Sequence, residues 1–335
     1  MPALAMSLPK RILVLGGSGF IGLRLSQRLA GEGAELVLAD DFSRGRQDRE
    51  LNDFIAAAPR ARLIHVDLTR ASSFETLGSF DEVYLLAAIV GVGNAVHRPA
   101  DVLRTNTLIV LHTLEWMERS RSKRLFYAST SENYAGGYEH QLVPIPTPET
   151  VPLVISDIQN PRFSYAVSKL WGEAAVQYLA ARAGFEFVIG RYHNVYGPRM
   201  GYEHVIPQLS MRIAAGETPL RVYAPNQTRA FCHVSDAVRA TVALMRCPAA
   251  MGRTVHIGND REEIAIGELA TMLLRTAGRE PLILPQPAPP GSVERRCPDV
   301  TLLRQLTGFE PETSLAIGLP ATFSWYRQAN PNAYE

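Results

Sequence analysis

The sequence predicts an α/β fold: a doubly wound parallel sheet with a smaller, interleaved α/β lobe toward the C-terminus. Apolar, β-branched segments alternate with helical segments over the first part of the chain, which is typical of βαβ units. After about residue 197, proline and glycine divide the chain into shorter elements. We therefore expect one domain over 1–195, with a returning strand near 230–262, and mainly a second lobe over 196–335.

The first βαβ unit is the clearest part of this pattern. RILVLGG (11–17) is a continuous apolar strand, FIGLRLSQRLAGEG (20–33) predicts a helix that ends at glycine, and ELVLADD predicts the next strand. Helices are expected over 101–120 and 162–183. Further strands are expected in five segments: ARLIHVDL, EVYLLAA, KRLFYAST, EFVIGRYHN and RTVHIGND (253–260).

Composition limits the kinds of ligand. A formal net charge of +1 and the lack of any Lys/Arg block argue against a nucleic-acid or membrane surface. Cys232, Cys247 and Cys297 are too widely spaced for a disulfide framework or a zinc site, and the eight histidines have no metal-ligand spacing, so we expect no metal. We find no signal-peptide pattern and no apolar run of about 18 residues, and expect a cytoplasmic protein with a small ligand.

A glycine-rich loop joins the first strand to the first helix. GGSGFIG carries glycines at a spacing of three, namely Gly16, Gly19 and Gly22. They permit a tight turn that lets a pyrophosphate approach the helix N-terminus, as in Rossmann-type folds. Asp40 ends the second strand, where a carboxylate can bind the adenosine ribose hydroxyls and repel a 2′-phosphate. NAD is therefore favoured over NADP, although Arg44 and Arg46 lie nearby.

Two further segments carry reactive side chains. LFYASTSENYAGG (125–137) ends an apolar strand in hydroxyls and a carboxylate, which suits either an ST-type turn or a ligand site at the sheet edge. SYAVSK places Tyr165 and Lys169 four residues apart, on one face of a helix. Lowering the pKa of a tyrosine by about three units needs about 4 kcal/mol, which a lysine and an oxidised nicotinamide could provide.

Taken together and in this order, the motifs resemble those of the extended short-chain dehydrogenase/reductase family, particularly its nucleotide-sugar epimerase, dehydratase and decarboxylase branch. Nearly the whole chain takes part. The matching segments are GGSGFIG, STSENYAGG, PRFSYAVSK, RYHNVYGPRM, QTRAFCHVSDAV and TVHIGND. The combination is specific, although each piece alone is common.

The resemblance implies a set of NAD-binding residues. Asp67 and Leu68 would lie near the adenine, and a histidine is frequent in the family where Leu85 stands. Asn106 matches an asparagine of the helix after the fourth strand, although it could instead be a residue of a helix start. The implied cofactor-binding residues are Gly16, Gly19, Phe20, Ile21, Gly22, Asp40, Asp67, Leu68, Leu86, Ala87, Ala88, Asn106, Tyr165, Lys169 and Tyr192.

The resemblance also implies catalytic roles. Tyr165 would be the base, Lys169 its electrostatic partner, and Thr130 a hydrogen-bonding partner of the sugar hydroxyl. Ser131 stands where the family's 4,6-dehydratases have an Asp, which makes dehydration less expected. Glu132 resembles the carboxylate of the decarboxylases, although it could merely cap the next turn.

Substrate contacts are implied for four residues, which lie on both sides of the predicted domain boundary. Ser131 and Asn194 would contact the nucleotide sugar, and Arg229 and Arg296 would clamp its diphosphate, a role suited to a planar guanidinium. His193 stands where the family commonly has phenylalanine, and we expect it to be a structural residue near the nicotinamide.

The resemblance implies an NAD-dependent enzyme that transiently oxidises the sugar of a nucleotide-diphosphate sugar, at C4. Epimerisation leads our expectations, followed by decarboxylation of a uronate through Glu132, then 4-dehydrogenation or 4,6-dehydration. A non-catalytic NAD-sensing protein is a distant alternative. The two helices that contain Asn106 and Tyr165 resemble those of the family's dimer interface, so we expect a homodimer, with Trp116 and Trp171 in the core or at that interface.

Overall fold

The computed structural model describes residues 9–44, 47–289 and 292–328, so Arg46 lies outside the described residues. The chain divides into two compact units. The first comprises Met1–Ile89, Arg104–Ala128 and Gly172–Phe187, and the second comprises Val90–Leu103, Ser129–Trp171 and Val188–Glu335. The predicted domain boundary near residue 195 stays a prediction.

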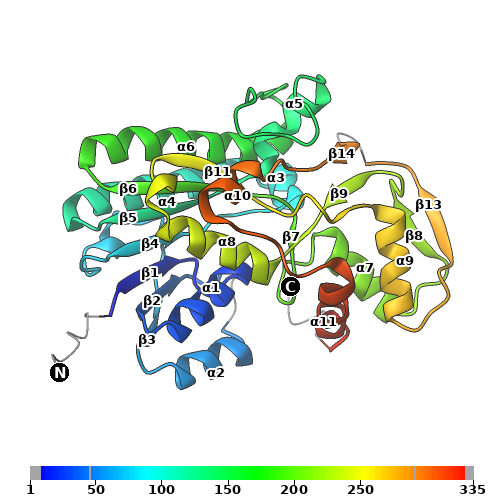
Figure 1. Ribbon diagram of the computed structural model, residues 1–335, viewed down its shortest axis with the longest axis horizontal. Coiled ribbons are helices and arrows are strands. Elements are labelled where there is room, and N and C mark those ends of the chain that lie inside the picture. Colours follow the sequence, from blue (N-terminus) through cyan, green and yellow to red (C-terminus); the bar gives the residue numbers. More distant parts are fainter. Residues whose placement is uncertain (1–8, 45–46, 290–291, 329–335) are drawn as a thin grey trace. The chain divides into compact units, whose positions relative to one another are not determined.

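The predicted doubly wound sheet is confirmed. Within the described residues, seven strands pair in the order β11-β6-β5-β4-β1-β2-β3 (Figure 1). Their bounds are β1 Arg11–Leu15, β2 Glu35–Asp40, β3 Ala61–His65, β4 Glu82–Leu85, β5 Arg124–Thr130, β6 Glu186–Tyr192 and β11 Arg253–Ile257. The strand predicted over 253–260 is thus β11, which pairs in parallel with β6.

Each strand of the first unit is followed by a helical segment, as the alternating pattern predicted. The helix predicted over 20–33 is α1, and those predicted over 101–120 and 162–183 are α4 and α6. Each agrees with the prediction within two residues at both ends. The helices up to α6 are α1 Phe20–Gly31, α2 Arg49–Ala57, α3 Val92–His97, α4 Pro99–Ser120, α5 Ala135–Glu139 and α6 Ser164–Ala183, with short 3₁₀ turns η1 Ala71–Phe74, η2 Ser131–Tyr134 and η3 Pro161–Phe163.

The strand order changes side at β1. This strand pairs in parallel with β2 on one side and β4 on the other, so that Val14 lies opposite both Leu38 and Tyr84. Leu13, Val14 and Leu15 are fully buried, as expected for a strand covered on both faces. In open α/β sheets, ligands bind beyond the carboxyl ends of the strands where the strand order reverses. The glycine loop after β1 lies at this point.

Trp116 of α4 belongs to the core of the first unit. It is 3% exposed, and its indole Nε1 donates to the carbonyl of Leu77 at 3.1 Å. Its ring packs against Phe74 and Phe80. The indole hydrogen bond satisfies the polar end of a buried tryptophan, and the core alternative for this residue is therefore the correct one.

The second unit adds the short elements expected after residue 197. They are β7 Val195–Tyr196, α7 Val205–Ala214, β8 Leu220–Tyr223, β9 Thr228–Ala230, β10 Cys232–His233, α8 Val234–Arg246, η4 Pro248–Ala250, β12 Glu263–Ala265, α9 Ile266–Thr276, β13 Ile283–Gln286, β14 Arg295–Arg296, α10 Thr301–Thr307 and α11 Leu315–Gln328. Buried side chains of α7, α9 and α11 form one apolar cluster, including Leu209, Leu273 and Phe323. QPAPPGSVERRCPD, expected as a loop, also contains β14, which pairs with β9.

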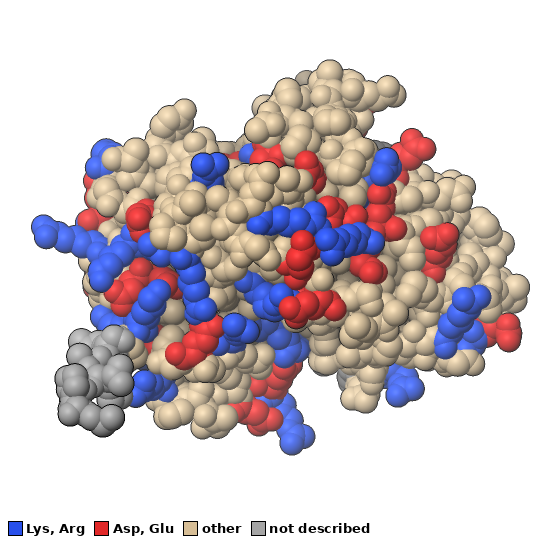
Figure 2. Space-filling view, in the orientation of Figure 1, with Lys and Arg blue, Asp and Glu red and all other residues tan. Residues whose placement is uncertain are grey.

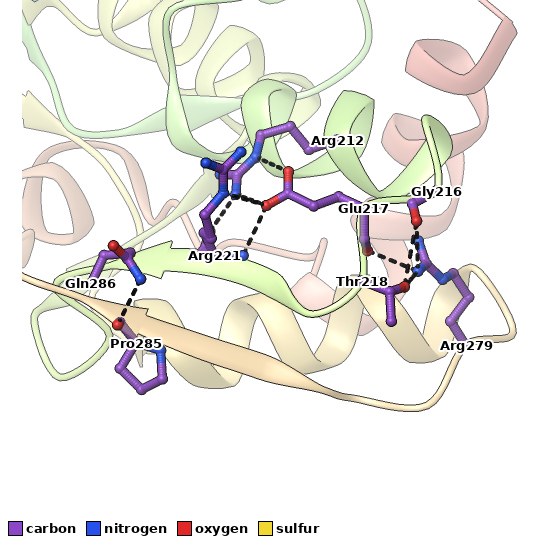
Figure 3. Close-up of polar contacts among 8 residues, drawn as sticks. All are labelled: Arg212, Gly216, Glu217, Thr218, Arg221, Arg279, Pro285 and Gln286. Carbon is purple, nitrogen blue, oxygen red and sulfur yellow. Dashed lines mark hydrogen bonds and ion pairs between the residues drawn. The ribbon is translucent and has the colours of Figure 1, made fainter.

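A charged cluster holds the loop between α7 and β8 (Figure 3). The guanidinium of Arg212 donates to both carboxylate oxygens of Glu217, at 2.7 and 2.6 Å, and Arg221 donates to the same carboxylate at 3.0 Å. Arg279 donates to the carbonyls of Ile213, Gly216 and Glu217, at the end of α7. The cluster thus fixes the end of α7 and the loop that follows it.

One face of the molecule carries mixed charge. On the face in Figure 2, basic and acidic side chains lie close together rather than in patches of one sign, in keeping with the balanced composition. No helix among the described residues is long and apolar enough to cross a membrane, and no group of metal-binding side chains occurs among them. All three cysteines fall within the described part and are unpaired.

Candidate functional site

The glycine loop has a geometry that only glycine permits at two positions. Gly16 has φ +87°, and a Cβ there would lie 2.7 Å from the backbone nitrogen of Ala87. A Cβ on Gly22 would lie 2.1 Å from the carbonyl oxygen of Gly16. The loop therefore packs tightly against both the start of α1 and the chain after β4. Phe20 and Ile21 open α1 at this point, with Gly19 as its N-cap.

Asp40 is fixed by two backbone amides. Its carboxylate accepts hydrogen bonds from Ser18 N at 3.0 Å and Phe42 N at 2.9 Å, one on each oxygen. The side chain is 7% exposed. Each carboxylate oxygen has a second lone pair, so the group can still accept from ribose hydroxyls while it ties the glycine loop to the end of β2.

The chain after β4 lies against this loop. Leu86 N and Ala87 N both donate to the carbonyl of Leu15 at 2.9 Å, which carries Leu86, Ala87 and Ala88 past the glycine turn. Asn106 holds the next residue, Ile89: its side-chain oxygen accepts from Ile89 N at 2.7 Å and its amide donates to Ile89 O at 3.1 Å. Asn106 lies inside α4, so the alternative of a helix-start residue is wrong.

Asp67 occupies a tight turn. Its carboxylate accepts from the hydroxyl and backbone N–H of Thr69 and pairs with Arg70 at 3.1 Å. The Thr69 hydroxyl lowers the pKa of this carboxyl most, burial opposes the shift, and Arg70 adds to it. Leu68 is buried beside it. Together with the glycine loop and Asp40, these groups offer backbone and carboxylate positions that fit a dinucleotide.

Thr130 ends β5 and begins the turn that follows. Its hydroxyl accepts from Glu132 N at 3.1 Å and so caps η2. Thr130 is 8% exposed and Ser131 3% exposed. The ST-type turn expected here is therefore present, and it holds these hydroxyls at a strand end.

Glu132 pairs with Arg296. Its Oε1 accepts from Arg296 Nη1 at 2.5 Å, with the side chains 29% and 6% exposed respectively. Burial raises the pKa of Glu132, but the charges of Arg296 and Arg162 outweigh burial and the net shift is downward. Because this carboxylate bonds a guanidinium and Thr130 supplies the cap, the alternative that Glu132 merely caps the next turn is wrong.

Further basic groups surround this pair. Arg162 Nη2 lies 4.0 Å from Glu132 Oε2, and the guanidinium of Arg296 lies 5.8 Å from the ring centre of Tyr138. Arg229 donates to the carbonyls of Thr228 and Val293, both at 2.7 Å. Burial first, and then the charge of Arg296, lowers the pKa of Arg229 to about 10. The surroundings of Glu132 thus carry an excess of positive charge.

Tyr165 and Lys169 lie near the start of α6, as predicted. The Lys169 Nζ lies 5.9 Å from the centre of the Tyr165 ring, and Lys169 is 3% exposed. The helix start is held by Ser164, whose hydroxyl donates to Ala95 O at 3.2 Å, and by Ser168, whose hydroxyl donates to Tyr165 O at 2.7 Å. A buried ammonium beside a phenol is suited to stabilising a phenolate.

The residues after β6 have mixed roles. The Tyr192 hydroxyl bonds Thr241 at 2.7 Å, and burial raises its pKa. His193 is fully buried and packs against His256, and burial lowers its pKa well below the ordinary value. Asn194 has φ +39° and donates to Ala230 O at 3.2 Å. The neutral, buried state of His193 fits a structural residue.

Sequence reasoning missed Arg162 and a chain of buried polar side chains. Arg162 lies within the motif PRFSYAVSK, directly before the tyrosine segment, but an isolated arginine gave no signal. The chain consists of Tyr134, Arg191 and His256, which come from three distant segments. Their contact depends on the tertiary structure, and only their place inside quoted motifs could have drawn attention to them.

Known proteins are similar to this chain over most of its length. The model of the NAD dependent epimerase/dehydratase family matches residues 12–258. A UDP-N-acetyl-alpha-D-glucosaminuronate decarboxylase of Bacillus cytotoxicus is 32% identical over 331 residues, which cover 95% of this chain and 98% of that protein.

Two solved structures are similar over almost their full length. A UDP-glucose 4-epimerase of Thermotoga maritima, with UDP-glucose, is 27% identical with a TM-score of 0.82, covering 95% of this chain and 99% of that one. A dTDP-glucose 4,6-dehydratase of Streptomyces venezuelae, with NAD bound, is 26% identical with a TM-score of 0.84, covering 97% and 99%. The fold is thus shared with proteins of different reaction types.

Proposed function

Because the chain belongs to the NAD-dependent epimerase/dehydratase family, we propose that it oxidises a nucleotide-diphosphate uronic acid at C4 and releases the C5 carboxyl group as carbon dioxide. One observation carries this choice: Glu132, at the carboxyl end of β5, is held ionised by the buried Arg296. Sequence alone led us to favour epimerisation, and this pair changes that preference.

Stability alone does not explain the Glu132–Arg296 pair. Burying two charges costs several kcal/mol per ion, so such a pair adds little stability over apolar residues of similar size. Interconversion of a 4-hydroxyl and a 4-ketone needs only a base such as Tyr165, a cation such as Lys169 that stabilises it, and a hydride carrier. A charged group beside the sugar is useful when a second bond, at C5, must be broken.

The residues for the first step are those of α6 and the end of β5. Tyr165, with its phenolate stabilised by Lys169, takes the proton of the C4 hydroxyl, and Thr130 orients that hydroxyl. The glycine loop and Asp40 would hold NAD, which would supply the hydride acceptor for oxidation at C4 and the donor for the later reduction.

The second step removes the carboxyl group. With a ketone at C4, the C5–C6 bond breaks, its electron pair moves to the C4 oxygen as an enolate, and carbon dioxide leaves. Water then supplies a proton to C5, and Tyr165 returns its proton to the C4 oxygen when C4 is reduced again. The hydroxide that the water leaves combines with the released carbon dioxide as bicarbonate, so atoms and charge balance with no net oxidation. Glu132 would orient that water, and Arg162 and Arg229 would attract the anionic substrate.

Epimerisation remains the second candidate. The similarity to UDP-glucose 4-epimerase supports it, and Thr130, Tyr165 and Lys169 suffice for oxidation and reduction at C4. Dehydration is less favoured because Ser131 has no acidic proton for a leaving hydroxyl. Turnover of any nucleotide sugar would exclude a purely NAD-sensing role.

We further propose a homodimer formed through α6. Trp171 and Tyr178 of this helix are 38% and 78% exposed, and they lie seven residues apart on one face. Apolar side chains exposed on one helix face are typical of an interface.

The test is product analysis with carboxyl-labelled substrates. UDP-glucuronate and UDP-N-acetylglucosaminuronate, each ¹³C-labelled at C6, are incubated with the purified protein, alongside UDP-glucose. Labelled carbon dioxide together with a UDP-pentose supports the proposal. An isomer of unchanged mass, with the label retained, overturns it in favour of epimerisation.

A matched pair of variants tests the role of Glu132. Glu132→Gln removes the charge that pairs with Arg296 and should abolish carbon dioxide release. Glu139→Gln is the control, because Glu139 lies 3.9 Å from the same Arg162 but has no ion pair with Arg296 among the described contacts. Equal losses in the two variants would contradict a specific role for Glu132.

A further inference from the structure

Arg191, Tyr134, His256 and Asp299 form a buried chain of hydrogen-bonded groups near the segments that carry Glu132 and Arg296. Arg191 Nη1 lies 2.5 Å from the Tyr134 hydroxyl, which lies 2.7 Å from His256 Nε2. His256 Nδ1 in turn lies 2.9 Å from the carbonyl oxygen of Asp299. Tyr134 and His256 are fully buried and Arg191 is 4% exposed.

The chemistry of the end groups fixes the direction of every hydrogen bond. A carbonyl only accepts, so His256 Nδ1 carries the proton. A guanidinium only donates, so the Tyr134 oxygen accepts from Arg191. The Tyr134 hydroxyl is then left to donate to Nε2 of a neutral His256. Burial lowers the pKa of His256 to about 3, which agrees with a neutral ring.

The two partners of the His256 ring, Tyr134 and Asp299, each lie close in sequence to one member of the ion pair. Tyr134 ends η2, two residues after Glu132, and Asp299 follows Arg296 by three residues. The backbone of His256 is itself held, because its N–H donates to the Glu149 carboxylate at 2.9 Å. A second link runs parallel to the first: the Tyr138 hydroxyl bonds Thr147, whose backbone N–H donates to Cys297 O.

We propose that His256 is a positioning residue, which joins the turn carrying Glu132 to the segment carrying Arg296 through its two ring nitrogens. The pair is formed by residues 164 positions apart in the sequence, and its 2.5 Å contact depends on both segments staying in register.

This role rests on the proposed function, so the test follows the two chemical steps separately. Tyr134→Phe removes only the hydroxyl, and His256→Asn removes the Nε2 acceptor while an amide remains near Asp299. Misplacement by about 1 Å can cost about 100-fold in rate. We expect carbon dioxide release to slow by roughly 10- to 100-fold in each variant, with KM changed less than about threefold.

Oxidation at C4 should survive in the same variants. Reduced cofactor, followed by its near-ultraviolet absorbance after mixing with substrate, should then accumulate while carbon dioxide release is slow. A merely structural defect would reduce both signals in proportion to the folded fraction. The double variant should be no slower than either single variant, because both break one chain.

Tyr326→Phe is the matched control. This buried tyrosine likewise loses one hydroxyl, which here donates to the carbonyl of Met200, and none of the described contacts joins it to the chain from Arg191 to Asp299. It should lower thermal stability about as much as Tyr134→Phe and leave carbon dioxide release unchanged. If both variants slow release equally, the positioning role is overturned.

The protonation of the His256 ring can be measured by NMR, and this test of the bridge does not depend on which reaction the protein catalyses. In ¹⁵N-histidine NMR, with the signal assigned by its loss in His256→Asn, Nδ1 should be protonated and Nε2 unprotonated. If the wild-type protein epimerises without releasing carbon dioxide, the proposed function is wrong. The bridge through His256 would still be supported by this tautomer, and by losses of thermal stability in Tyr134→Phe and His256→Asn that do not add in the double variant. A protonated Nε2 or additive stabilities would overturn it.

Discussion

Glu132 and Arg296 form a hydrogen-bonded ion pair of 2.5 Å across 164 residues of sequence. The turn after β5 presents the carboxylate, and the two-residue strand β14 presents the guanidinium. The arginine is almost completely buried, so its charge is compensated chiefly by this carboxylate. The predictions below begin with this pair.

Removing one member of the pair should cost stability. Glu132→Gln leaves a buried, uncompensated guanidinium, and we expect a loss of about 1–3 kcal/mol, less than the figure of about 3–5 kcal/mol for fully buried pairs because Glu132 is partly exposed. Urea unfolding at neutral pH measures it. The double variant Glu132→Gln/Arg296→Gln should recover part of the loss. A double variant less stable than Glu132→Gln would contradict this account.

The Tyr165 hydroxyl should be essential for oxidation at C4. Tyr165→Phe is expected to lower kcat by about 100- to 10,000-fold, the usual contribution of a positioned acid–base group. Bound NAD, measured by mass spectrometry of the native protein, should be retained. Tyr178→Phe, which removes an exposed hydroxyl from the same helix, serves as control. Activity within tenfold of wild type in Tyr165→Phe would rule out its role as base.

The tight glycine loop should tolerate no side chain at Gly22. Gly22→Ala places a Cβ against the carbonyl oxygen of Gly16, so the loop must open and NAD should be lost from the purified protein. Gly31→Ala in the same helix meets nothing within 4 Å and should stabilise the protein by about 0.5–1 kcal/mol. Cofactor content by absorbance and thermal unfolding distinguish the two. Full NAD occupancy in Gly22→Ala would refute this placement.

The Glu217 cluster should stabilise the second unit in a pH-dependent way (Figure 3). The hydrogen bond from Arg212 lowers the pKa of Glu217 most, burial opposes the shift, and Arg221 adds to it. Because the folded-state pKa is depressed, the stabilisation is fully present above the unfolded pKa of about 4.3 and is lost as pH falls toward the folded value. Glu217→Gln should therefore cost about 1.5–3 kcal/mol at pH 7 and progressively less below pH of about 4.

Glu118→Gln is the control for this experiment. Its partner Arg182 is 61% exposed, and exposed ion pairs contribute about 0–1 kcal/mol. Denaturant unfolding of both variants across a pH series measures the difference. A pH-independent effect of Glu217→Gln would show that packing, rather than charge, is responsible.

The exposed face of α6 should carry the dimer contact. Tyr178→Glu places a charge among apolar side chains of this face and should convert a dimer into a monomer of 36.9 kDa. Light scattering at micromolar concentration measures the mass. If the wild-type protein is already a monomer, the proposed dimer is refuted.

Much of the fold was predictable because it depends on local patterns. The apolar run RILVLGG and the glycine spacing predict β1, its turn and α1, and these elements form as expected. Burial on both faces of a parallel strand requires a continuous apolar run, and close backbone approach requires glycine. The Tyr165–Lys169 spacing likewise places both residues near the start of one helix.

The pairing of distant segments was not predictable in this way. Arg229 and Arg296 looked alike as candidate diphosphate clamps, yet Arg229 bonds backbone carbonyls and Arg296 bonds Glu132. Nothing in either local sequence distinguishes them, because each choice depends on which acceptor the folded chain brings near. The diphosphate role of both residues stays a prediction.

The sequence by itself determined the α/β class, the dinucleotide loop and the residues of the reactive helix, since their physical causes are periodicity, backbone sterics and helical spacing. Only the tertiary structure decided that Glu132 is an ionised partner of Arg296 and that His256 bridges Tyr134 and Asp299. The charge state of a carboxylate and the tautomer of a histidine depend on burial and on the partners within hydrogen-bonding distance, which arise only when distant segments pack together.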